Sequence, residues 1–175
     1  GEAVTVRGWA MTTRSSGKIA FLVLRDGTGY LQAVFSRKEV SDAVWEAFQR
    51  LTQETSLAVT GTVRAEPRSP GGFELPASDL TILGPSVDFP ISPKEHGTSF
   101  LFEHRHLWLR SRRQVAIARV RHEVVQAIRD FFYERGFVLV DTPILTGSIG
   151  EQAGELFATD YFDLGKAYLA QTGQL

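Results

Sequence analysis

Residues 111–145 read SRRQVAIARVRHEVVQAIRDFFYERGFVLVDTPIL, and this stretch decides the fold. Its first two-thirds carry apolar residues at spacings of three and four, which line one face of a helix. These residues are Ile117, Val120, Val124, Ile128 and Phe131. Ser111 with Gln114 predicts a capping box at the start, and Gly136 predicts a left-handed cap after Arg135. The sequence therefore predicts a long helix over residues 112–135.

An apolar run follows this helix without a linker. Phe137–Val140 is rich in β-branched residues and predicts a buried strand. Pro143 ends the run because proline donates no ladder hydrogen bond, so we expect it at a sheet edge or a second subunit. By themselves, such a helix and strand are also typical of an ordinary α/β domain.

Composition excludes several classes of protein. The 175 residues, 43% of them hydrophobic, allow one large domain or two small ones. No cysteine is present, so we expect neither disulfides nor thiolate metal sites, as in a reducing cytoplasm. No run approaches the ~20 apolar residues of a membrane span, and the N-terminus lacks signal-peptide features. A net charge of −1 argues that any RNA is recognised by shape and bases, not by bulk charge.

Residues 1–84 predict a small β-barrel domain. The pattern of apolar and polar residues predicts strands at 4–9, 30–35, 57–64 and 73–83 from alternation, a further strand that is apolar on both faces at 19–25, and a helix at 41–51. Three strands, a helix and two more strands is the order of an OB-fold, a five-stranded barrel whose second and third strands commonly bind oligonucleotides. Other small barrels with a similar number of strands are the alternative.

The strand phases indicate a candidate site on this barrel. Gln32 alternates with apolar neighbours, and Glu74 does the same, so both are expected to point out of the barrel. Phe21 lies in a strand that is apolar on both faces, so it belongs either to the core or to the surface. An exposed ring beside an outward amide offers a single-stranded base one surface for stacking and one edge for pairing.

The prolines of residues 85–108 predict a stiff hinge between two domains. His104 and His106 would share a face if this segment were a strand. We expect no metal there, since no cysteine or further ligand accompanies them. In residues 109–175, strands are expected at 157–162 and 167–171 in one sheet. Glu151, Gln171 and Gln174 fall at strand ends and loops, where they either bind a small zwitterion or are ordinary surface residues.

Taken together, these stretches resemble the class II aminoacyl-tRNA synthetases. Residues 111–145 resemble motif 1 of that family, which builds a homodimer interface and whose signature proline corresponds to Pro143. The barrel carries the pattern of the anticodon-binding domain of the aspartyl, asparaginyl and lysyl subgroup: Gly8-Trp9, Arg14, Gly17, Phe21, Arg25-Asp26, Gly29 and Gln32. The resemblance implies that the anticodon is held by Arg14, Phe21, Gln32 and Glu74, with Phe21 stacking on the central uridine and Gln32 reading it.

The end of the sequence resembles the family's amino-acid-pocket motif. Residues 168–175 read YLAQTGQL, and the resemblance implies amino-acid binding by Glu151, Gln171, Thr172 and Gln174. Gly173 favours the asparaginyl branch over the aspartyl one. Three positions depart from the usual pattern: Thr172 replaces serine, and Gly147 and Gln152 stand where proline and glycine are usual.

The resemblance thus implies an α+β protein: a five-stranded OB-fold barrel over 1–84, a hinge over 85–108, and the start of a class II antiparallel-sheet catalytic domain over 109–175. Its implied activity is ligation of asparagine to the 3′ end of tRNA(Asn), with ATP and Mg²⁺. Motifs 2 and 3, which carry the family's catalytic arginines and ATP site, do not occur in these residues, so the 175-residue chain alone is expected to be inactive. An aspartyl enzyme, including one that charges both tRNAs, and a non-enzymatic OB-fold RNA-binding module are the alternatives.

Overall fold

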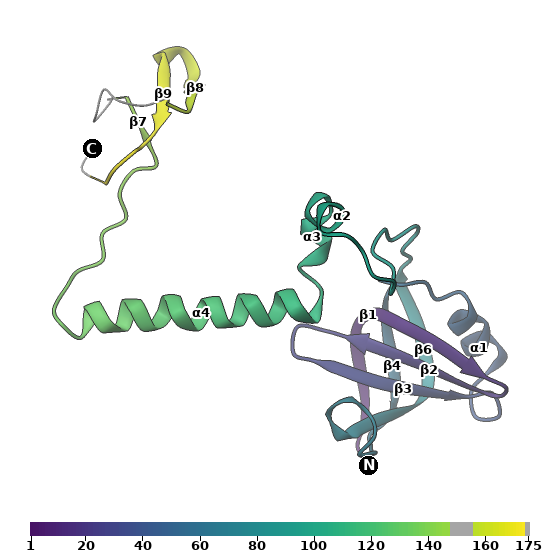
Figure 1. The fold of residues 1–175 in the computed structure, drawn as a ribbon. Helices are drawn as coiled ribbons and strands as arrows, with labels where there is room; N and C mark the ends of the chain where they lie inside the picture. The colour runs from purple at the N-terminus through teal and green to yellow at the C-terminus, as the bar shows by residue number, and fades with distance from the viewer. Residues whose placement is uncertain (148–155, 174–175) are drawn as a thin grey trace. The chain divides into compact units, whose positions relative to one another are not determined.

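The computed structural model describes residues 1–147 and 156–173. The chain divides into two compact units, residues 1–108 and 109–175, and each is described by itself (Figure 1). Residues 85–108 fall within the first unit. Their role as a hinge stays a prediction.

The first unit contains the predicted order of strands and helix. Its barrel elements are β1 (Ala3–Ser16), β2 (Ile19–Arg25), β3 (Tyr30–Ser36), α1 (Asp42–Gln49), β4 (Ser56–Thr62), β5 (Arg64–Ala65), the 3-10 turn η1 (Pro70–Gly72) and β6 (Phe73–Gly84). The strands follow one another in the sheet as β3-β2-β1-β4-β6-β5, and an additional parallel pairing joins β3 to β6. The predicted fourth strand is therefore two strands, and Pro76 does not interrupt the last one.

Alternate side chains of these strands form the core. Leu22, Phe35 and Leu75 have no exposed surface. Ser41 starts α1 by accepting a hydrogen bond from the Val44 amide, and the helix then packs Phe48 against Phe35 with ring centroids 5.2 Å apart. The barrel is thus filled by ordinary strand alternation, which leaves the intervening side chains on its outer surface.

The turn between β2 and β3 is held by the side chain of Asp26. The Asp26 carboxylate accepts hydrogen bonds from the Thr28 hydroxyl and amide and from the Gly29 amide. These bonds, the hydroxyl's first, hold the pKa of Asp26 below its usual value. The turn fixes the register in which β2 and β3 present their side chains.

Gly61 marks a place where β4 and β6 approach closely. It pairs with Ala77 at a register shift, and a Cβ at this position would lie 2.2 Å from the Pro76 carbonyl oxygen. We expect Gly61→Ala to lower the free energy of unfolding by about 1–3 kcal/mol, because one of the two strands must move. Urea denaturation measures this effect.

Gly27→Ala is the matched control for Gly61→Ala. A Cβ at Gly27, in the β2–β3 turn, meets nothing within 4 Å, so this variant is expected to unfold near the wild-type urea concentration. Equal midpoints for the Gly61 variant and wild type would show that the contact with Pro76 does not constrain the barrel.

The segment around His104 and His106 is helical, so the two histidines do not share a strand face. This region folds into two short helices, α2 (Thr98–Glu103) and α3 (Arg105–Trp108), with His104 at the end of the first. The His104 ring packs on Phe100, four residues earlier, with centroids 4.4 Å apart, a spacing that stabilises helical turns. Within the described residues, no three His, Cys, Asp or Glu side chains gather as a metal site would require.

The second unit begins with the long helix α4 (Arg112–Tyr133). The predicted start is confirmed, because the Ser111 side chain accepts a hydrogen bond from the Gln114 amide. The helix ends at Tyr133 instead of Arg135, and Gly136 has the predicted left-handed conformation with a φ of 80°. The Phe137 amide closes the helix on the Phe132 carbonyl at 3.1 Å, as in a Schellman cap. No residue of α4 is buried, so its predicted apolar stripe is exposed.

The predicted buried strand over Phe137–Val140 is wrong. The segment forms no strand, and Val138 is 84% exposed. The reason is that a strand needs a neighbour, and no described residue pairs with this run. Its apolar, β-branched side chains therefore have no strand partner among residues 1–147 and 156–173.

The predicted strand pair at the end of the chain is confirmed in shorter form. A three-stranded antiparallel sheet has the order β7-β9-β8. Its strands are β7 (Leu145–Thr146), β8 (Ala158–Asp160) and β9 (Lys166–Leu169), with the 3-10 turn η2 (Phe162–Leu164) between the last two. Across the described residues, no helix is both long and apolar enough to cross a membrane.

Candidate nucleic-acid interface

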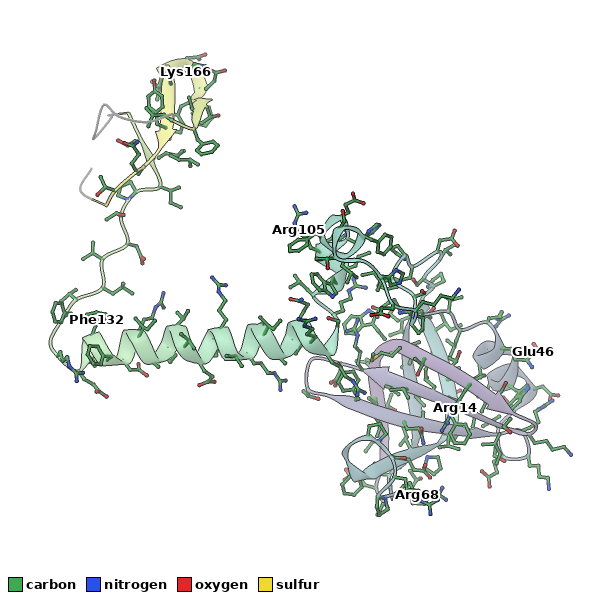
Figure 2. The ribbon with its side chains drawn as sticks, viewed as in Figure 1. Arg14, Glu46, Arg68, Arg105, Phe132 and Lys166 are labelled. Atoms are coloured by element: carbon green, nitrogen blue, oxygen red, sulfur yellow. The ribbon has the colours of Figure 1, made fainter. Side chains whose placement is uncertain are left out.

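Phe21 lies on the outside of the barrel. Its neighbours in β2, Ala20 and Leu22, are fully buried, whereas Phe21 is half-buried and therefore points the other way. The antiparallel register pairs Phe21 with Arg14 on one side. The Arg14 guanidinium lies over the ring, 4.4 Å from its centroid, and Figure 2 shows Arg14 on the barrel. A ring and a guanidinium plane together form a flat, cationic surface on which a base can stack.

Gln32 extends this surface across β3. The β2–β3 register pairs Phe21 with Val34, and Gln32 lies two residues from Val34 on the same face. The parallel β3–β6 pairing then sets Gln32 directly opposite Glu74. The strand pairings thus bring the four residues predicted to bind the anticodon onto one outer surface of the barrel: Arg14, Phe21, Gln32 and Glu74.

Glu74 differs from its prediction in exposure. It leaves the core as expected, but only 5% of it is exposed because Arg64 and Ser69 cover it. Arg64 lies opposite it in the β5–β6 pair and donates from Nε to Oε1 at 3.0 Å. This hydrogen bond and the carboxylate's charge raise the pKa of Arg64. Phe73, expected on the inner side, is 52% exposed.

Two residues of this surface were missed by the sequence analysis. The sequence pattern predicts Arg64 as the end of a single strand. Its charge is opposite to that of Glu74 across the hairpin, and such a pair indicates that the two side chains are in contact. Ser69 is buried in the loop beside η1, where no periodicity predicts the direction of a side chain. Its hydroxyl lies 3.1 Å from Gln32 Nε2.

The predicted amino-acid pocket is only partly described. Glu151 and Gln174 lie outside the described residues. Gln171 is exposed and Thr172 half-buried in the bend after β9. The Ala170 amide donates to the Ile144 carbonyl at 2.9 Å, and a Cβ on Gly173 would lie 3.3 Å from Thr142. The motif therefore runs beside the chain segment that contains Pro143.

Comparison with known families covers both units. Residues 4–83 match the family of OB-fold nucleic acid binding domains, and residues 97–175 match the class II tRNA synthetases (D, K and N). Residues 97–175 therefore belong to a class II tRNA synthetase domain. The fold class of the chain is confirmed as an OB-fold domain joined to part of a class II synthetase domain.

Several similar proteins are synthetases for asparagine. The chain is 53% identical to an asparagine–tRNA ligase of Chloroflexus aurantiacus and 51% identical to one of Symbiobacterium thermophilum, over its whole length and 40% of theirs. The asparaginyl-tRNA synthetase of Pyrococcus horikoshii, solved with asparaginyl-adenylate, superposes with a TM-score of 0.88 at 35% identity, covering 99% of this chain and 40% of that one. That of Entamoeba histolytica, also with asparaginyl-adenylate, has a TM-score of 0.79 at 28% identity over the same shares. The chain thus spans about 40% of the length of the curated relatives it matches.

Proposed function

We propose that this protein is an asparagine–tRNA ligase whose barrel binds the anticodon of tRNA(Asn). The observation that carries the proposal is the outer surface of β2 and β3, where a half-exposed ring and an amide lie beside each other on a nucleic-acid-binding fold. Identity above 50% to asparagine–tRNA ligases supports asparagine as the amino acid.

The residues of the barrel would divide the work of anticodon recognition. Phe21 supplies the stacking surface and Gln32 the edge that reads the base. Arg14, exposed beside Phe21, is placed to contact a base or a neighbouring phosphate. Glu74, paired with Arg64, can bind a nucleotide directly only if Arg64 changes partners. We therefore assign Glu74 mainly to holding this surface in shape.

The second unit would begin the amino-acid site. In this proposal Glu151 takes the ammonium group, and Gln171, Thr172 and Gln174 donate and accept hydrogen bonds around the substrate. ATP supplies the adenylyl group in the ligase reaction, and Mg²⁺ neutralises its phosphate charge. No described residue is assigned to either, and no described cluster fits a metal ion.

Aminoacylation by the full-length gene product tests this proposal. We expect tRNA(Asn) to be charged with asparagine and not with aspartate, because a neutral amide and a carboxylate need different partners. Charging with aspartate would make the protein an aspartyl or dual-specificity enzyme. Binding of RNA without any charging would make it a non-enzymatic RNA-binding module.

The exposed stripe of α4 supports a homodimer in this proposal. Val120 is 65% exposed and Ile128 53%, more apolar surface than a helix in water normally leaves uncovered. We propose that a second copy covers the stripe, with the segment around Pro143 at the same interface. Such an interface would also give Phe137–Val140 the neighbour that no described residue supplies.

Ile128→Asp is expected to shift the full-length protein from dimer to monomer, because the carboxylate would be desolvated at the interface. Sedimentation velocity measures the shift. Arg119→Asp places the same side chain on the opposite face of α4 and is expected to leave the dimer intact. A dimer that survives Ile128→Asp would place the interface elsewhere.

A further inference from the structure

A chain of polar contacts runs beneath the base-reading surface. Arg64 donates to Oε1 of Glu74, the Ser69 hydroxyl lies 3.5 Å from Oε2 of the same carboxylate, and Nε2 of Gln32 lies 3.1 Å from the Ser69 oxygen. Ser69 is 8% exposed and Glu74 5%. Ser69 thus joins a buried, charged group to the Gln32 amide on the outer surface of the barrel.

The chemistry of these groups fixes the direction of each hydrogen bond. Glu74, paired with a guanidinium, is a carboxylate and can only accept. Among the described residues its Oε2 has one donor, the Ser69 hydroxyl, and a buried carboxylate oxygen without a donor is costly. The proton of Ser69 therefore points at Glu74.

The Ser69 oxygen is then left as an acceptor. Its neighbour Gln32 must turn its NH₂ group toward it, which is the orientation the structure has. The Gln32 carbonyl oxygen consequently points away from Ser69, and it has no partner among the described residues. An amide that could otherwise rotate by 180° is held with its acceptor available to a ligand.

We propose that Ser69 is a positioning residue that makes Gln32 an acceptor and thereby selects bases carrying a ring N–H. This inference rests on the proposed function, in which Gln32 reads a base stacked on Phe21. Uracil offers N3–H to such an acceptor, whereas cytosine presents a lone pair at the same ring position. Without the Ser69 oxygen, the amide can turn its NH₂ outward and accept cytosine as well.

Binding of anticodon hairpins that differ at the central base tests the proposal. Fluorescence anisotropy with labelled hairpins carrying uridine, cytidine or N3-methyluridine gives three dissociation constants for each form of the full chain. For wild type we expect uridine to bind about tenfold more tightly than the other two, because each lacks the N3–H donor. For Ser69→Ala we expect the uridine-to-cytidine ratio to fall close to one.

Two variants separate positioning from folding. Ser69→Thr keeps the hydroxyl and is expected to keep the wild-type ratio. Ser78→Ala removes an exposed β6 hydroxyl that donates to the Thr60 carbonyl, away from Gln32, and is expected to change nothing. A Ser69→Ala variant that weakens all three hairpins equally, or keeps the wild-type ratio, overturns the proposal.

Two comparisons made with the wild-type protein distinguish failure of this inference from failure of the proposed function. If wild type binds no hairpin better than an unrelated RNA, anticodon binding itself is refuted. If it prefers its cognate hairpin yet tolerates N3-methyluridine, only the role assigned to the Gln32 acceptor is refuted. This second comparison needs no variant, so it decides the matter even if Ser69→Ala does not fold.

Discussion

Phe21→Ala is expected to weaken binding of a cognate anticodon hairpin by about 1–3 kcal/mol, or roughly five- to 150-fold. The ring lies on the outer surface between two fully buried neighbours, so its removal takes away a stacking surface and opens no core cavity. In this variant Arg14 also loses the ring against which its guanidinium packs. Its side chain then has more conformational freedom, which weakens RNA binding further. Anisotropy titration of the full chain measures the change.

Phe102→Ala is the control for this experiment. Phe102 is 56% exposed in α2 and packs against Trp108, outside the barrel. We expect its removal to leave hairpin affinity unchanged. Wild-type affinity in the Phe21 variant would assign that ring to a purely structural role.

Phe35→Ala is expected to lower stability, in contrast to Phe21→Ala, which is expected to lower RNA affinity. The expected loss is about 3–5 kcal/mol in the free energy of unfolding. Phe35 has no exposed surface, packs against Phe48 of α1, and lies opposite Ala20 in the β2–β3 pair. Its removal leaves a cavity that joins the barrel to its helix. Denaturant unfolding measures the loss, at a temperature where the variant is still folded.

Phe73→Ala is the matched control in this case. The ring of Phe73 is 52% exposed, so its removal is expected to change stability far less. Equal losses for Phe35→Ala and Phe73→Ala would mean that the division into core and outer surface is wrong.

The sequence was sufficient where local rules act alone. The ends of α4 follow from Ser111 and Gly136, since a cap depends on residues within one turn. The outward direction of Gln32 follows from alternation along β3. Phe21 needed the structure, because both faces of its strand are apolar and only the burial of Ala20 and Leu22 shows which is inner.

The remaining differences arise from contacts distant in sequence. Phe137–Val140 has the composition of a strand, but pairing depends on a neighbour that its own residues do not specify. The side chains of Gln32 and Ser69 are hydrogen-bonded although they lie 37 residues apart in the sequence. The pairing of β3 with β6 brings them together. In each case tertiary context overrides the local pattern.

The most direct test of the central claim is photo-crosslinking of an anticodon hairpin that carries 5-iodouridine at its central position. If that base stacks on Phe21, the crosslink should fall in the tryptic peptide of residues 19–25, which follows Lys18 and ends at Arg25. A crosslink confined to any other peptide, at hairpin concentrations that saturate binding, would contradict the proposal that this surface holds the anticodon.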